Sequence, residues 1–221
     1  MAIIRPSHEP KGSVQTGLGA APAIETEEVC VMNQRFSTRR LAMLGMMTAL
    51  VFASNYARIT MPIAIGGKTS FTLANIVCCL SGLLLGPIGG LASGLGSALY
   101  DLTNPLFAPE CWITFITKGI MGLAAGLVVK SSLEQDKLTY SRGLAGAVTG
   151  CIAYYVLYFF KCFAYDGLLI EGLQPAVALG ILPLKVPASV FNASVAIIAA
   201  PPLALAIRAA LKRSGLSLNK A

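Results

Sequence analysis

The sequence predicts an all-α integral membrane protein, folded as a bundle of six transmembrane helices. Of the 221 residues, 55% are hydrophobic and only 12% are charged, and the mean hydropathy is +0.70. An ordinary soluble domain carries about 25% charged residues, so these values exclude a typical soluble enzyme. A spanning helix needs about 20 mostly apolar residues. The chain therefore has room for about six such helices and a tail.

Six apolar blocks follow one another along the chain. Helices and closed barrels are the structures that satisfy the backbone in lipid, and the alternating pattern of barrel strands is missing from this sequence. We therefore expect each block to form a helix. Turn-forming or charged residues separate the blocks, as at Gly86-Pro87, at Asn104-Pro105 and over residues 134–137. The expected helices cover about 41–57, 71–86, 88–104, 112–130, 143–165 and 184–209.

The distribution of basic residues predicts the orientation of the helices. Twelve of the 17 Lys and Arg residues fall in segments that face the cytoplasm if the N-terminus is inside. Because cytoplasmic loops are enriched in basic residues, we expect both termini in the cytoplasm. Prolines and acidic residues predict a flexible cytoplasmic tail over residues 1–38. The membrane domain is expected over residues 39–213, and a second cytoplasmic tail over residues 214–221.

Composition also excludes several classes of function. The net charge is +7, but the basic residues lie between apolar blocks, whereas nucleic-acid-binding proteins gather them on one face or tail. We expect membrane lipid around this chain and no nucleic acid partner. The one histidine, His8, lies in the tail, and no pair of carboxylates falls inside an apolar block. We therefore expect neither an enzyme nor a metal or cofactor site.

Polar and aromatic residues recur on one face near the same end of each of the last three expected helices. Spacings of three and four residues place side chains on one helical face. If the three faces converge, they form an outward-opening cavity with aromatic walls and cationic corners, which suits a small anionic or zwitterionic ring compound. The candidates, helix by helix, are Trp112, Phe115 and Lys118; Tyr154, Tyr158, Lys161 and Tyr165; and Lys185, Ser189 and Asn192.

Lys118 carries the most specific of these signals. It lies inside an otherwise apolar block, and an ionisable group within a membrane is by default a functional hypothesis. The alternative is a structural ion pair with Asp101 or Glu110. Lys185 or Tyr165 alone is better explained as an interfacial residue that extends toward the lipid headgroups. Asp101 and Asn104, at the end of the third block, either line the cavity or anchor the loop that follows.

Small residues form a stripe along the first expected helix. Gly45, Ala49, Ala53 and Ala57 recur every four residues, a spacing that lets another helix approach closely. The stripe has two interpretations, which are packing inside the bundle and docking of a partner protein.

Several motifs resemble the substrate-binding S component of an energy-coupling factor (ECF) vitamin transporter. The most specific is the leucine, glycine and proline signature within residues 82–90, between the second and third blocks. Residues 69–75, 100–105 and 185–193 are similar to other segments of that family. The resemblance covers most of residues 39–210.

The resemblance implies a binding subunit, with several membrane passes, in the bacterial plasma membrane. Such a subunit captures a vitamin or related micronutrient from outside. It docks onto a transmembrane coupling (T) protein through a small-residue face on its first helix, and two cytoplasmic ATPases drive release of the cargo inside. The stripe from Gly45 to Ala57 is then the expected docking face. The family's pocket includes the outer loop after the first helix, so Arg58 joins the candidate residues.

The candidate site favours a folate-like, pantothenate-like or pyridoxal-like compound over a cation such as thiamine. The alternative function is a stand-alone secondary transporter or channel, which would show internal repeats, broken helices and a coupling carboxylate. The predicted substrate-binding residues are Arg58, Asp101, Asn104, Trp112, Phe115, Lys118, Tyr158, Lys161, Lys185 and Asn192.

Overall fold

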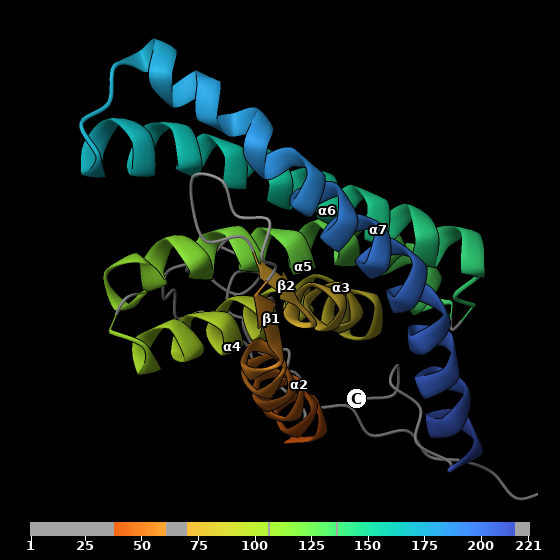
Figure 1. Cartoon of the computed structure of the whole chain (residues 1–221). Coiled ribbons are helices and arrows are strands. Elements are labelled where there is room, and N and C mark those ends of the chain that lie inside the picture. Colours follow the sequence, from red (N-terminus) through yellow and green to blue (C-terminus); the bar gives the residue numbers. More distant parts are fainter. Residues whose placement is uncertain (1–37, 61–69, 106, 136, 215–221) are drawn as a thin grey trace, which may run out of the picture. The chain divides into compact units, whose positions relative to one another are not determined.

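A computed structural model describes residues 38–60, 70–105, 107–135 and 137–214 (Figure 1). The chain divides into two compact units, and every described residue belongs to the second, Phe36–Ala221. The expected N-terminal tail lies outside the described residues apart from Thr38, and the expected C-terminal tail lies outside them apart from Ser214. Both tails remain predictions.

Six α-helices account for most of the described residues, and they follow the six apolar blocks of the sequence. Two 3-10 turns connect helices of the bundle, and a π-helical segment continues the fifth helix. The α-helices are α2 (Thr38–Tyr56), α3 (Ala74–Leu85), α4 (Gly89–Thr103), α5 (Cys111–Glu134), α6 (Tyr140–Lys161) and α7 (Pro175–Arg213). The two 3-10 turns are η1 (Gly86–Ile88) and η2 (Ala108–Glu110), and the π-helical segment is η3 (Cys162–Ile170).

Four stretches of the described chain are long and apolar enough to cross a membrane, which makes this a helical protein with several membrane passes. They are Ala74–Thr103, Ala108–Glu134, Tyr140–Ile170 and Pro175–Arg213. The first joins α3 to α4, which fold back on each other so that the hydroxyl oxygens of Ser81 and Ser93 lie 2.6 Å apart. Because α3 has 12 residues and α4 has 15, each is shorter than a full crossing requires. Six complete crossings and cytoplasmic termini therefore stay predictions.

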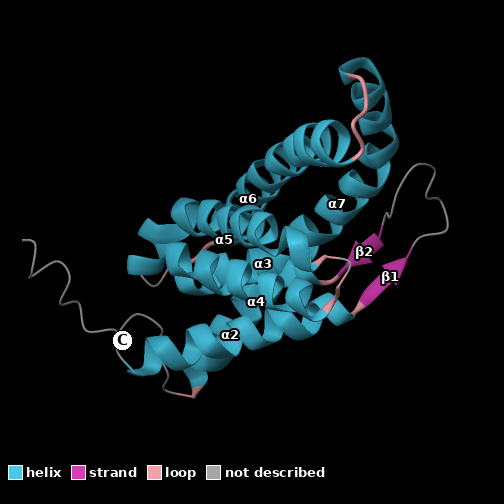
Figure 2. Cartoon of the chain, turned by 90° about the vertical axis from the view of Figure 1, so that its left-hand side faces the viewer, coloured by secondary structure: helices cyan, strands magenta, loops and turns pink. Residues whose placement is uncertain are grey.

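A short hairpin corrects the expectation of a purely helical fold. Strands β1 (Arg58–Thr60) and β2 (Ser70–Thr72) pair antiparallel, with Ile59 opposite Phe71 (Figure 2). The second expected helix, α3, therefore begins at Ala74 rather than near residue 71. The β-branched and aromatic residues of these two segments favour strands, a preference that the long apolar run after them concealed in the sequence.

The last helix is longer than expected. It begins at Pro175 and runs through Pro183, Pro187, Pro201 and Pro202. The first proline suits an initial helical turn, where its missing N–H costs nothing. Prolines inside membrane helices are tolerated because neighbouring groups satisfy the freed carbonyls. The start expected near residue 184 was therefore wrong.

Glycines allow α4 and α5 to pack closely. A Cβ at Gly90 would lie 2.7 Å from the carbonyl oxygen of Gly119, and one at Gly122 would lie 2.5 Å from the Ser93 hydroxyl. A side chain at either position would clash, as expected for a helix pair built on small residues. The close approach holds the first turns of α5, including Lys118, against the rest of the bundle.

Helix α3 is the centre of the bundle and contacts all five other α-helices. Cys78, Cys79, Leu80 and Leu83 on this helix are fully buried. Its first turn therefore lies where residues from several helices can meet, at the end of the bundle that also carries the β-hairpin. We call this the hairpin end.

Candidate substrate-binding site

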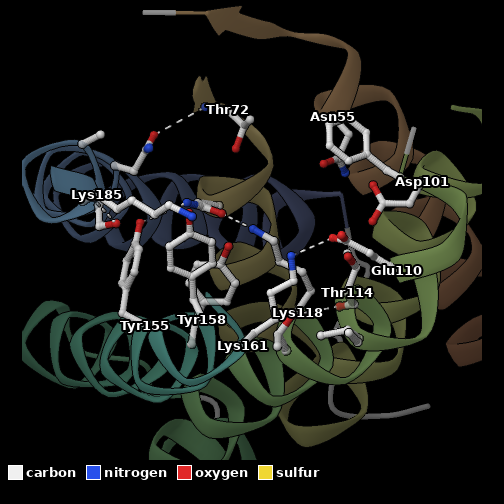
Figure 3. Close-up of a pocket in the computed structure, with 18 residues that line it drawn as sticks. Asn55, Thr72, Asp101, Glu110, Thr114, Lys118, Tyr155, Tyr158, Lys161 and Lys185 are labelled. Atoms are coloured by element: carbon white, nitrogen blue, oxygen red, sulfur yellow. Dashed lines mark hydrogen bonds and ion pairs between the residues drawn. The ribbon is translucent and has the colours of Figure 1, made fainter. Parts of the chain in front are cut away.

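A cavity with a volume of about 200 Å³ lies at the hairpin end (Figure 3). Pockets for drug-sized ligands typically measure about 300–1,000 Å³, so this cavity suits a small ring compound. Every α-helix from α2 to α7 contributes to its wall, together with β2 and η2. The lining residues are Asn55, Thr72, Asn75, Asp101, Phe107, Glu110, Ile113, Thr114, Thr117, Lys118, Tyr154, Tyr155, Tyr158, Lys161, Lys185, Ala188, Ser189 and Asn192.

Lys118 lies in the wall of the cavity and is only 7% exposed. Its ammonium group donates a hydrogen bond to the Asn75 side-chain oxygen and lies 4.3 Å from the centroid of the Tyr154 ring. The amide nitrogen of Asn75 donates to the Tyr155 hydroxyl at 3.4 Å, which orients the Asn75 oxygen toward the lysine. Both direct partners of Lys118 are therefore neutral.

A second polar group joins four elements beside the cavity. The Lys161 ammonium lies 2.7 Å from a carboxylate oxygen of Glu110 and 2.7 Å from one of Asp166. Lys185 lies 4.0 Å from the second oxygen of Asp166. We call these four residues the charge network. The alternative in which Glu110 pairs with Lys118 does not hold, because η2 places this carboxylate beside Lys161 at the end of α6.

Three tyrosines of α6 form an aromatic wall. The rings of Tyr154 and Tyr158 stack at a centroid distance of 5.9 Å and an interplanar angle of 25°. Tyr155 packs edge-on against both, at 4.9 Å from Tyr154 and 6.2 Å from Tyr158. Such an arrangement offers ring faces for stacking and hydroxyl groups for hydrogen bonds.

The hairpin contacts α7 beside the cavity. The backbone N–H of Thr72 donates to the side-chain oxygen of Asn192 at 3.4 Å. The ring of Phe71 packs edge-on against Phe191 at 5.7 Å. These contacts hold β2 against the helix that carries Lys185.

The structure brings together six of the ten residues predicted for the substrate site. Asp101, Lys118, Tyr158, Lys161, Lys185 and Asn192 all line the cavity. The backbone of Arg58 lies in β1, but its side chain is outside the described residues.

Asn104, Trp112 and Phe115 are not among the cavity-lining residues. Steps of three residues each turn a side chain by about 60° around a helix of 3.6 residues per turn, so Trp112 points about 120° away from Lys118. Trp112 is 56% exposed, and Phe115 packs toward Gly94 on α4. The Asn104 carbonyl accepts backbone hydrogen bonds from Phe107 and Ala108 at 2.9 Å, which anchors the loop before η2.

Sequence reasoning missed six polar residues of the cavity, which are Asn55, Thr72, Asn75, Thr114, Thr117 and Tyr155. The sequence carried a signal for three of them. Thr72 and Asn75 belong to the motif over residues 69–75. Tyr155 is adjacent to a predicted stripe. The Asn55 side chain donates to the Val51 carbonyl at 2.9 Å, so it gave no signal beyond a polar residue at the end of an apolar block.

The small-residue stripe of α2 faces away from the bundle. Gly45, Ala49 and Ala53 are exposed, as is Ala57 just after the helix, whereas Met47 and Val51 on the opposite face are buried. A Cβ at Gly45 would meet nothing within 4 Å. Among the described residues, the stripe is therefore not an internal packing surface.

Comparison with known families identifies the chain. The family model described as "ECF-type riboflavin transporter, S component" matches residues 35–209. The chain belongs to this family. The match confirms the resemblance to ECF S components, and it makes the protein a substrate-binding component of a vitamin transporter rather than a member of an enzyme family.

One solved structure, "Structure and mechanism of the S component of a bacterial ECF transporter", is also similar to this S component. The similarity covers 77% of this chain and 98% of that chain, with a TM-score of 0.49 and 17% sequence identity. No curated relative matches the sequence.

Proposed function

We propose that this S component captures a vitamin from outside the cell in the cavity at the hairpin end. The observation that carries the proposal is the cavity itself, because a protein of a vitamin-transporter family holds a wall of tyrosines and a buried lysine in one pocket. Aromatic rings beside placed polar groups are typical of small-molecule sites, and most of the side chains that line this cavity are polar or charged. The hairpin end then faces the outside, and both termini face the cytoplasm.

The charges of the cavity favour a nearly neutral ring compound. Lys161 and Lys185 lie beside the carboxylates of Glu110 and Asp166, which leaves Lys118 with only neutral direct partners. A cargo with several negative charges, such as a folate, would meet Glu110 and Asp101 in the same cavity. Riboflavin is nearly neutral, planar and rich in hydrogen-bonding groups, and it is the compound named by the family. We propose it as the cargo, with a pyridoxal-like single ring as the alternative that the small cavity volume favours.

Transport requires partners in this proposal. The exposed face of Gly45, Ala49, Ala53 and Ala57 is the surface on which a transmembrane coupling protein docks, since small residues permit close helix contact. Two cytoplasmic ATPases bound to the coupling protein drive release of the cargo inside the cell. The protein itself resides in the bacterial plasma membrane.

Binding and uptake measured separately test this function. The purified full-length chain in detergent is titrated with riboflavin, pyridoxal, pantothenate and folate, and binding is followed by calorimetry. Saturable 1:1 binding of riboflavin or pyridoxal, with no binding of folate, is expected. Uptake into proteoliposomes is expected only with the coupling protein, the ATPases and internal ATP. Uptake by this chain alone would support a secondary transporter and contradict the proposal.

A further inference from the structure

Lys118 differs from the other two lysines of the cavity in what surrounds its charge. Lys161 touches two carboxylates and Lys185 lies 4.0 Å from one. Within the part of the chain that the structure describes, Lys118 has no carboxylate within ion-pairing distance. Its contacts are the Asn75 amide oxygen and the face of the Tyr154 ring.

Neutral groups, and no carboxylate of the described residues, surround the buried charge of Lys118. A buried charge is normally paired, because its desolvation is compensated only by an opposite charge or a full set of hydrogen bonds. Lys118 is 7% exposed, and of its three donors one is used by Asn75 and another lies close to the side chain of Tyr154. Figure 3 shows the side chain of Lys118 extending into the group of polar residues that lines the cavity.

The surroundings hold the ammonium group in place. Asn75 is fixed by its own hydrogen bond to the Tyr155 hydroxyl, and Tyr154 is fixed by stacking on Tyr158. The ammonium group thus lies against the tyrosine wall, over the face of the Tyr154 ring. A ring compound that enters the cavity therefore meets Lys118 and the tyrosine wall together, because both line it.

We propose that Lys118 is the specificity-determining residue of the cavity and that it binds an acceptor-rich edge of the cargo ring. The chemical class is a planar heterocycle with adjacent carbonyl oxygens and unprotonated ring nitrogens, or a single ionised oxygen, on one edge. The cargo supplies the partial or full negative charge that the protein does not place beside Lys118. The inference rests on the proposed function and names the part of the cargo that the site recognises.

Stability in the absence of ligand gives the first test. Lys118→Met removes the charge and keeps much of the side-chain length, and Lys118→Arg keeps the charge. If the charge serves the ligand, the ligand-free Lys118→Met protein melts at the same temperature as the wild type or higher, because an uncompensated buried charge has been removed. A markedly lower melting temperature for Lys118→Met would assign the lysine to the architecture of the bundle and overturn the proposal.

Binding gives the second test, with riboflavin and lumiflavin as probes. The two share the ring, and lumiflavin lacks the hydroxylated chain. A hydrogen bond to a charged group contributes about 1.5–3 kcal/mol, which corresponds to about 10-fold to 150-fold in affinity. Lys118→Met is expected to weaken both probes by the same factor in this range, and Lys118→Arg by much less. A loss confined to riboflavin would place Lys118 against the chain and contradict the proposal.

The reduction potential of bound riboflavin gives a third test, because it responds to loss of the lysine charge and not to a packing defect alone. A cation beside the pyrimidine edge stabilises the negative charge of the reduced ring, so the potential falls in Lys118→Met and is retained in Lys118→Arg. If the wild type binds neither flavin, the proposed cargo is wrong, and the compound that copurifies replaces the probes. Equal affinity of wild type and Lys118→Met for that compound would then overturn the role of Lys118.

Discussion

Replacing Lys161 by Met is expected to destabilise the protein by removing the centre of the charge network. The lysine makes two charged contacts of 2.7 Å, and the three side chains involved are only 18%, 29% and 24% exposed. A hydrogen bond to a charged group contributes about 1.5–3 kcal/mol when buried. Partial exposure and side-chain entropy reduce this contribution, so we expect about 2–3 kcal/mol for the pair of contacts.

Thermal unfolding of the purified chain in detergent measures the effect. For a chain of this size, 1 kcal/mol shifts the melting temperature by about 2–4 °C, so Lys161→Met should melt about 4–12 °C below the wild type. Glu110→Gln is the matched control, because it removes one charge and retains an acceptor, and a drop less than half as large is expected. Melting of Lys161→Met within about 1 °C of the wild type would refute the reasoning.

A double-mutant cycle separates the interaction between Glu110 and Lys161 from the effects of each substitution on other contacts. Residues that share a contact show a coupling of about 0.5–3 kcal/mol. The combined variant Glu110→Gln, Lys161→Met should therefore lose less stability than the sum of the two single variants. Additive losses would show that Glu110 and Lys161 act independently, against the geometry of the network.

Three further predictions concern helix packing, docking and the aromatic wall. Gly122→Ala places a Cβ 2.5 Å from a hydroxyl of α4 and should lower the free energy of unfolding by more than about 2 kcal/mol, as overpacking does. Gly180→Ala is the control, because its Cβ meets nothing within 4 Å. This control should leave the melting temperature unchanged or raise it. Ala49→Trp should abolish copurification with the coupling protein, while the isolated chain still binds the vitamin. Leu203→Trp, on the exposed face of α7, is the control and should retain copurification and vitamin binding. If Ala49→Trp loses vitamin binding as well as copurification, the stripe is not a docking face. Tyr158→Phe should keep most of the vitamin affinity measured by titration. Tyr158→Ala should lose about twofold to tenfold, since ring contacts contribute about 0.5–1.5 kcal/mol. Equal affinities of Tyr158→Ala and the wild type would remove Tyr158 from the binding surface.

The apolar blocks predicted the helices well because lipid leaves the backbone few alternatives. Where the structure differs, the cause is local. The strands at Arg58–Thr60 and Ser70–Thr72 are too short to produce a periodic signal, and their pairing depends on two segments that are separated in the chain. The early start of α7 at Pro175 was hidden by prolines, which end helices in water and are tolerated among packed membrane helices.

The candidate site was predictable as a set of stripes but not as a set of contacts. Helical spacing correctly grouped Lys118, Tyr158 and Lys185 at one end of the bundle, where all three line the cavity. It also included Trp112, because three-residue steps drift by about 60° each around the helix. The partner of Lys118 could not be found from spacing, since Asn75 lies 43 positions away on α3 and only the packing of α3 against α5 brings the two together.

The measurement that most directly tests the central claim is mass spectrometry of the small molecule that copurifies with the chain. Wild type is compared with Thr114→Trp, which fills the cavity, and with Ile116→Trp on the exposed face of the same helix. A vitamin in near-equal amount to the protein should appear with wild type and Ile116→Trp and disappear with Thr114→Trp, while all three remain folded. The same compound bound equally to all three proteins would show that the cavity at the hairpin end is not the binding site.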